Sequence, residues 1–131
     1  MSHLSLGRRG ENAAEEFLRR SGHRIVTANY TGAGGEIDLI TIKKGVLYFV
    51  EVKTKSGMAY GPPSGELTSE KTARLRRTAR EFIKLDGGRG RVPFYMGPFR
   101  YTRKYKSWRF CLAEVIIADG AERIAYTGIE N

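Results

Sequence analysis

The sequence has few of the residues that build disulfides and zinc sites. Among its 131 residues there is one cysteine, Cys111, and there are two histidines, His3 and His23. A single cysteine excludes an internal disulfide, and these three residues cannot supply the spacing of a zinc site. We expect Cys111 to lie buried in a strand, where a thiol behaves as a small apolar group.

Long apolar runs are also missing. No stretch approaches the ~20 apolar residues of a membrane-spanning helix, and the N-terminal region lacks the apolar segment of a secretion signal. We therefore expect a soluble, cytoplasmic protein that has no membrane partner. Residues 1–131 have the size of one domain that is large enough for its own core.

Acidic residues are scarce relative to basic ones. The 23 lysines and arginines outnumber the 14 aspartates and glutamates, which gives a formal net charge of +9. Such a charge predicts a polyanionic partner, although charge alone does not distinguish DNA from RNA or from an anionic membrane.

Two short segments place acidic residues beside apolar β-formers. They are Gly35-Glu36-Ile37-Asp38-Leu39-Ile40 and Phe49-Val50-Glu51-Val52-Lys53, and Lys44-Gly45 between them is typical of a two-residue hairpin turn. With the turn centred there, residues whose numbers sum to 89 lie opposite each other. Asp38 then faces Glu51, and Glu36 faces Lys53, so we expect all four on one face at one end of the hairpin.

The rest of this hairpin is apolar on both faces, which predicts a buried central position. Ile40 and Phe49 extend the acidic face, and the other face carries Ile37, Leu39, Val50 and Val52. Opposed like charges destabilise a ladder by about 0.2–1 kcal/mol. Mg²⁺ suits such a site because it prefers oxygen ligands. The alternative is a salt-bridged strand end, in which Lys53 neutralises Glu36 and Asp38 while Glu51 reaches solvent.

These two segments resemble the YraN family of endonuclease-like proteins, within the PD-(D/E)xK nuclease superfamily. The resemblance implies an α/β fold with a restriction-endonuclease-like αβββαβ core, a central mixed sheet flanked by helices, as in Holliday junction resolvases. It places Asp38, Glu51 and Lys53 at the catalytic positions, with Asp38 and Glu51 holding Mg²⁺ or Mn²⁺. Ile37 stands where the superfamily name has proline. Resolvase-like relatives often form homodimers, but the sequence identifies no dimer face.

A helix is predicted from Leu6 to Arg20, with Ser5 as N-cap and Gly22 just past its end. Glu11 points toward its apolar stripe, where a carboxylate is costly unless it is paired or bound to a metal; the alternative is a glutamate that reaches water. Gly7 and Gly10 would allow another backbone to approach. The resemblance includes the Gly10-Glu11 pair, so we predict Glu11 as a further metal ligand, and Glu36 as a ligand or a neighbour of one.

A second helix is predicted from Thr68 or Ser69 to about Leu85, and it is strongly cationic. Such a face is usually solvated, but the scarcity of nearby acids favours a nucleic-acid contact, for which we select Lys71, Arg74 and Arg77. Lys71 also matches a lysine of the family pattern. The segment 54–66 before this helix is predicted to be a loop, in which Lys55 contacts a phosphate or is simply solvated.

The stretch from residue 89 to residue 109 alternates basic and aromatic residues and contains no acid. We predict a basic, aromatic-rich loop at about 87–108, in which Arg100, Arg103 and Lys104 bind nucleic acid; the alternative is that the aromatic rings pack on the core. Strands are expected at His23–Tyr30, Trp108–Ala118 and Glu122–Ile129. The family usually has an acid where this chain has Cys111, so we assign that strand no site residue.

The function hypothesis is a metal-dependent endonuclease that hydrolyses phosphodiester bonds in DNA, with branched or junction DNA as one form of substrate. Lys53 would orient the attacking water or stabilise negative charge in the transition state. Two alternatives stay open: a non-catalytic nucleic-acid-binding module that keeps the nuclease fold, and a basic docking face for an acidic protein.

Overall fold

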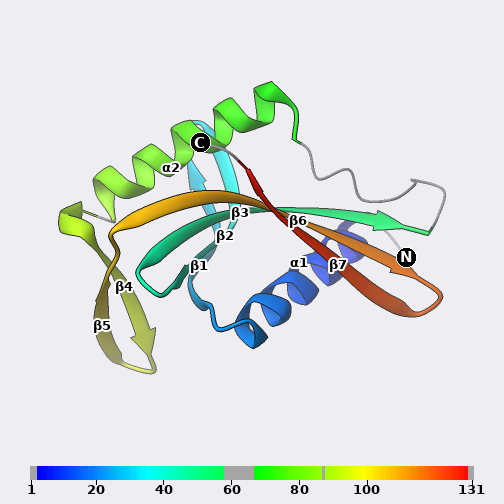
Figure 1. Cartoon of the computed structure of the whole chain (residues 1–131), viewed down its shortest axis with the longest axis horizontal. Coiled ribbons are helices and arrows are strands. Elements are labelled where there is room, and N and C mark those ends of the chain that lie inside the picture. The colour runs from blue at the N-terminus through cyan, green and yellow to red at the C-terminus, as the bar shows by residue number, and fades with distance from the viewer. Residues whose placement is uncertain (1–2, 58–66, 87, 130–131) are drawn as a thin grey trace.

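A computed structural model describes residues 3–57, 67–86 and 88–129. Figure 1 shows a long, twisted sheet with one helix on each face and a small hairpin that projects from one end. The elements in chain order are α1 (His3–Arg20), β1 (Arg24–Gly32), β2 (Gly35–Lys43), β3 (Val46–Ser56), α2 (Ser69–Leu85), a 3-10 turn (Gly88–Gly90), β4 (Arg91–Met96), β5 (Phe99–Lys104), β6 (Ser107–Ala118) and β7 (Ala121–Ile129).

The main sheet has five strands in the order β1-β2-β3-β6-β7, and β4 pairs with β5 in a separate sheet of two strands. Strands β3 and β6 are parallel, while the other neighbours are antiparallel. The predicted αβββαβ core is therefore confirmed, with the β4–β5 hairpin inserted before the parallel strand and β7 added after it. No helix among the described residues is long and apolar enough to span a membrane.

The central hairpin has the register that the sequence predicted. Lys44 and Gly45 both have positive φ, at 50° and 76°, as a tight turn between antiparallel strands requires. The β2–β3 ladder runs from Lys43–Val46 to Leu39–Val50, and every pair sums to 89. The ladder ends there, so Asp38 and Glu51 lie just beyond its last pair.

The two faces of this hairpin bury different partners. Ile40 and Phe49 belong to the cluster that contains Phe82 of α2, while Leu39 and Val50 belong to the cluster that contains Leu18 of α1. The central hairpin is therefore buried on both faces, as predicted.

The face predicted for Ile37 was wrong. Ile37 packs in the α2-side cluster with Ile40, whereas Leu39 packs on the α1 side. The strict alternation of β2 breaks between these residues, where its pairing with β3 ends.

The helix ends follow local signals. Gly22 has φ of 92° and donates its N–H to the Arg19 carbonyl at 3.1 Å, while the His23 N–H reaches the Leu18 carbonyl at 2.9 Å. This pair of bonds is a Schellman motif, which confirms the predicted end of α1. The predicted N-cap was wrong, because α1 begins at His3 and includes Ser5.

The second helix begins as predicted. The Thr68 side chain accepts a hydrogen bond from the Lys71 N–H at 3.2 Å, which satisfies one of the free donors of the first turn of α2. The helix then ends at Leu85, also as predicted.

Both predicted loops need correction. Residues 54–56 continue β3 and pair with Val115, Ile116 and Ile117 of β6, while residues 58–66 of the first loop lie outside the described residues. The stretch predicted as a loop at 87–108 contains the β4–β5 hairpin, whose turn includes Gly97 with φ of 59°. Val92 and Phe94 are buried and alternate with more exposed neighbours, a strand pattern that the surrounding cations obscured.

Candidate metal centre and nucleic-acid surface

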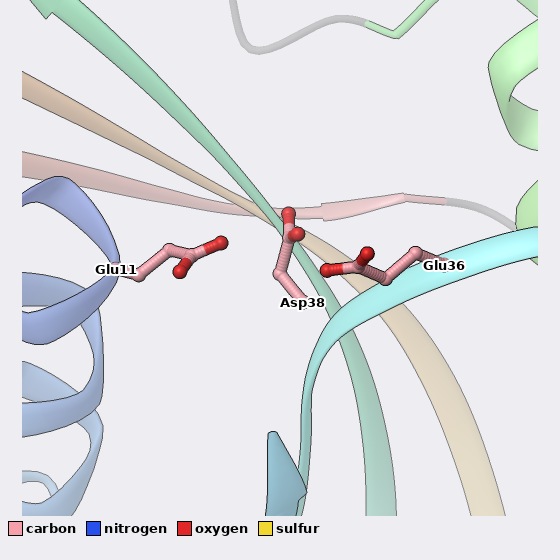
Figure 2. A group of neighbouring side chains, drawn as sticks. All are labelled: Glu11, Glu36 and Asp38. Carbon is pink, nitrogen blue, oxygen red and sulfur yellow. The ribbon is translucent and has the colours of Figure 1, made fainter. Parts of the chain in front are cut away.

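Three carboxylates converge between α1 and the start of β2. Glu11 comes from α1, and Glu36 and Asp38 come from β2; each offers an oxygen, and these oxygens all lie within 4.8 Å of one another. Figure 2 shows the Glu11 side chain extending from the helix toward the two side chains of β2. The structure therefore brings together three residues that the sequence predicted as metal ligands. We call Glu11, Glu36 and Asp38 the acidic cluster.

Gly10 explains how Glu11 reaches the sheet. A Cβ added at Gly10 would overlap the side chain of Thr54 on β3, whose Cβ would be 2.8 Å away. Only glycine permits α1 to lie this close to β3, and Glu11 follows directly in the chain. The predicted close backbone approach is thus confirmed at Gly10, whereas a Cβ at Gly7 would have no atom of the described residues within 4 Å.

Asp38 is held in place by the end of the β2–β3 ladder. Its Oδ2 accepts a hydrogen bond from the Val52 backbone N–H at 2.7 Å. Val52 lies beyond the last ladder pair, so the carboxylate supplies the acceptor that this part of β3 requires. Asp38 also shares a hydrogen bond with Glu51, its predicted neighbour across the hairpin.

The carboxyl groups disfavour one another's charge. Burial and the neighbouring Glu51 carboxylate raise the pKa of Asp38 from 3.8 to about 7, although the Val52 N–H acts in the opposite direction. The pKa of Glu11 is also raised, first by burial and then by the charges of Asp38 and Glu36. A bound divalent cation would favour the ionised forms, so the cluster has the electrostatics of a cation site.

Glu51 lies beside the acidic cluster but is not one of its three members. Burial raises its pKa, while Lys71 and the hydrogen bond with Asp38 lower it. Glu51 and Glu36 line a pocket of about 240 Å³ together with Lys71 and Arg74 of α2. The first two turns of the cationic helix therefore reach the acidic residues of the hairpin.

Lys53 follows Glu51 by two residues on β3. It is partly buried, and in the parallel β3–β6 register it pairs with Glu114, while Glu51 pairs with Leu112. Residues two apart share a face of a strand, so Lys53 lies on the Glu51 face. Its catalytic role stays a prediction.

Lys55, predicted as a phosphate or solvent contact, has a partner inside the fold. Its Nζ lies 3.3 Å from Oε2 of Glu114, and the two side chains are only 11% and 1% exposed. It is therefore not a solvated lysine, and we assign its ammonium to this ion pair. Sequence reasoning missed Glu114, although an acid inside the apolar run Cys111–Ile117 is itself a signal for a buried partner.

The other predicted nucleic-acid residues form two groups. Lys71, Arg74 and Arg77 are exposed on α2, and Lys71 and Arg74 line the pocket that contains Glu36 of the acidic cluster. Arg100, Arg103 and Lys104 are exposed on β5, in the hairpin at the opposite end of the sheet (Figure 1).

The fold and this site define a mixed α/β protein with a carboxylate cluster at the end of a central hairpin. Residues 10–115 match the Uncharacterised protein family UPF0102, which is the YraN family. The chain belongs to this family, as its hairpin motifs predicted. Membership by itself assigns no reaction.

Several relatives carry the same family name. A UPF0102 protein of Symbiobacterium thermophilum is 49% identical over 78 residues, which are 60% of this chain and 66% of the relative. A UPF0102 protein of Chloroherpeton thalassium is 37% identical over 89 residues, or 68% and 69% of the two chains. A UPF0102 protein of Rhodococcus jostii is 42% identical over 90 residues, which are 68% of this chain and 75% of the relative.

Proposed function

We propose that this protein is a divalent-metal-dependent nuclease that hydrolyses phosphodiester bonds in DNA. The observation that carries the proposal is the convergence of Glu11, Glu36 and Asp38, whose oxygens lie within 4.8 Å of one another. The cationic helix α2 lies beside this acidic cluster and gives a nucleic acid a surface to bind.

The donor set fits Mg²⁺ or Mn²⁺. Both are hard cations that prefer carboxylate oxygens, and the acidic cluster offers three such groups from two elements. Asp38 would be the central ligand, since its position is fixed by the Val52 N–H, with Glu11 and Glu36 beside it. Glu51 would act as a further ligand or orient Asp38 through their shared hydrogen bond. A bound ion would polarise the scissile phosphate and lower the pKa of a bound water.

The protein's own residues then position the substrate. Lys71 and Arg74 line the pocket beside Glu51 and would bind phosphates that flank the scissile bond. Lys53 would orient the attacking water or offset the negative charge that develops on the phosphate. Glu51, which shares a hydrogen bond with Asp38, would orient that carboxyl group beside the reacting groups.

A cleavage assay tests this function. Labelled duplex, single-stranded, flap and four-way-junction DNA would be incubated with Mg²⁺, with Mn²⁺ or with EDTA, using the parent protein, Asp38→Ala and Lys53→Ala. We expect metal-dependent cuts that fall by about 1,000-fold or more in Asp38→Ala, because several kcal/mol of transition-state stabilisation are lost. Arg123→Gln, on the exposed start of β7, is a control for a change in net charge.

Calorimetry gives an independent readout. Asp38→Ala should lose the Mn²⁺ binding of the parent protein, and unchanged affinity would remove Asp38 from the site. DNA binding without cuts, unaffected by both variants, would instead identify a non-catalytic nucleic-acid-binding module.

A further inference from the structure

A second candidate site lies at the other end of the central hairpin. A cleft of about 730 Å³ separates the β4–β5 hairpin from the β2–β3 turn. Its lining includes Arg24, Lys43 and Lys44 on one side and Arg103 and Lys104 on the other. Within the part of the chain that the structure describes, no acidic residue lines the cleft, so it is a concentrated positive surface.

One face of the hairpin contributes Phe94, Met96 and Tyr101 to this cleft. Cross-strand partners share a face, and the pairs Phe94–Tyr101 and Met96–Phe99 lie on the same face as buried Val92. Beyond the buried part, Met96, Phe99 and Tyr101 are 61%, 63% and 52% exposed. The face that packs into the core near Val92 therefore continues outward as an uncovered apolar surface.

We propose that this cleft binds an unpaired strand of nucleic acid. Exposed aromatic rings stack with bases of any sequence, and cations along the groove bind the phosphates, which together form the usual recognition chemistry of single strands. The excess of cations also favours a polyanion over an apolar protein segment as the occupant.

This inference rests on the proposed function and specifies its substrate class: DNA in which a duplex continues into a single strand. Lys43 lies five residues after Asp38 on β2, which is about 17 Å at about 3.4 Å per residue. A strand seated in the cleft would thus lie about five base steps of B-DNA away from the acidic cluster. Cuts should fall at a fixed distance of a few nucleotides from the point where the duplex ends.

The first test compares two tyrosines of the same hairpin. Binding of a fluorescent blunt duplex and of the same duplex with a single-stranded tail would be measured by anisotropy in EDTA, where no cleavage occurs. Tyr101→Leu should weaken binding of the tailed DNA by about fivefold or more, which is the lower range for loss of one stacked base, and leave the blunt duplex unchanged. Tyr95→Leu is the matched control, since Tyr95 is 70% exposed and pairs with Arg100 on the opposite face.

The second test concerns the phosphate contacts. Lys44→Asn removes a cation and introduces a residue type that tolerates the φ of 50° at this turn. The slope of log affinity against log salt for the tailed DNA should fall by about 0.7, the value for one phosphate contact to a single strand. Arg123→Gln, which removes an exposed cation far from the cleft, should leave that slope unchanged.

Three results would overturn the inference. Tyr101→Leu and Lys44→Asn could bind the tailed DNA with the affinity of the parent protein, or they could lose equal affinity for blunt and tailed DNA. Poly-glutamate could also displace the tailed DNA as effectively as a single-stranded oligonucleotide does. The last result would identify an acidic protein as the occupant. Binding is measured without metal, so this test does not depend on cleavage. The selectivity for tailed DNA can therefore be observed even if the assay with Asp38→Ala shows no metal-dependent cleavage to lose. Conversely, cleavage can be established while the tyrosine pair shows that the cleft is not used.

Discussion

The fold treats Glu114 of β6 and the acidic cluster of α1 and β2 in opposite ways. Glu114 is 1% exposed, and Lys55 lies 3.3 Å from it, so a buried negative charge has its counter-ion inside the protein. In the acidic cluster, Glu11, Glu36 and Asp38 lie together, and no ion pair reaches any of them from the residues that the structure describes.

This difference separates a structural acid from a binding site. The Lys55–Glu114 pair neutralises a charge inside the fold. The acidic cluster instead holds its oxygens close together, and burial and the neighbouring carboxylates raise the pKa of Asp38 to about 7. Groups that disfavour each other's charge in the folded state lower stability, and such arrangements are characteristic of functional sites. The variants below test whether the two groups differ in this way.

The largest effect is expected from Lys55→Met. Removing one partner of a buried ion pair destabilises a protein by about 3–5 kcal/mol, because the remaining charge loses its counter-ion. Urea denaturation would measure the decrease in the free energy of unfolding. The double variant Lys55→Met/Glu114→Leu should recover most of the loss, since both charges are then absent. Weaker DNA binding with unchanged stability would contradict the structural role and restore Lys55 as a phosphate contact.

The next effect concerns the placement of Glu11. Gly10→Ala should lower the free energy of unfolding by about 1–3 kcal/mol, because its Cβ overlaps the Thr54 side chain and forces α1 away from β3. The same shift moves Glu11 from the acidic cluster, so Mn²⁺ affinity measured by calorimetry should also fall. Gly7→Ala is the matched control in the same helix: its Cβ meets no atom of the described chain within 4 Å and should stabilise by about 0.5–1 kcal/mol. Equal effects of the two variants would remove the close approach at Gly10 from the explanation.

A smaller effect of opposite sign is expected from Asp38→Asn in metal-free buffer. Between the ordinary pKa of 3.8 and about 7, the folded chain keeps a proton that the unfolded chain loses, so stability decreases as the pH rises through this window. The asparagine side chain would keep an acceptor for the Val52 N–H without the charge, and should raise the free energy of unfolding at pH 8 by an amount on the order of 1 kcal/mol. The gain should vanish near pH 4.

Metal provides the control for that variant. Mn²⁺ should raise the melting temperature of the parent protein and leave that of Asp38→Asn unchanged, since only a ligand that binds the folded state stabilises it. A destabilising effect of Asp38→Asn at pH 8 without metal would show that the carboxylate contributes to the fold as Glu114 does.

The smallest effect is expected from Lys71→Gln. Lys71 lowers the pKa of Glu51, so its removal should raise that pKa further. Because Lys71 is exposed, the interaction is worth about 0.2–1 kcal/mol, and Mn²⁺ affinity near neutral pH should change by less than about fivefold. Lys84→Gln, near the other end of α2, is a control of equal charge. A loss as large as that of Asp38→Ala would mean that Lys71 has a direct part in the site.

Much of the fold was predictable because its signals are local. The Lys44-Gly45 turn set the register of the central hairpin, and Gly22 and Thr68 marked helix ends. The alternation of Val92 and Phe94 was equally local, yet the charged residues around it concealed the β4–β5 strands. In the site, the same register placed Asp38 next to Glu51.

Tertiary structure decided the contacts that join distant parts of the chain. Glu11 approaches Asp38 because Gly10 packs directly against Thr54. The Lys55–Glu114 ion pair forms because β3 pairs in parallel with β6. Periodicity describes which residues share a face within one element, but it does not fix which elements become neighbours. By itself the sequence determined the hairpin and its acids; only packing decided that Glu11 of α1 joins them and that Glu114 of β6 receives a counter-ion, because both contacts join distant parts of the chain.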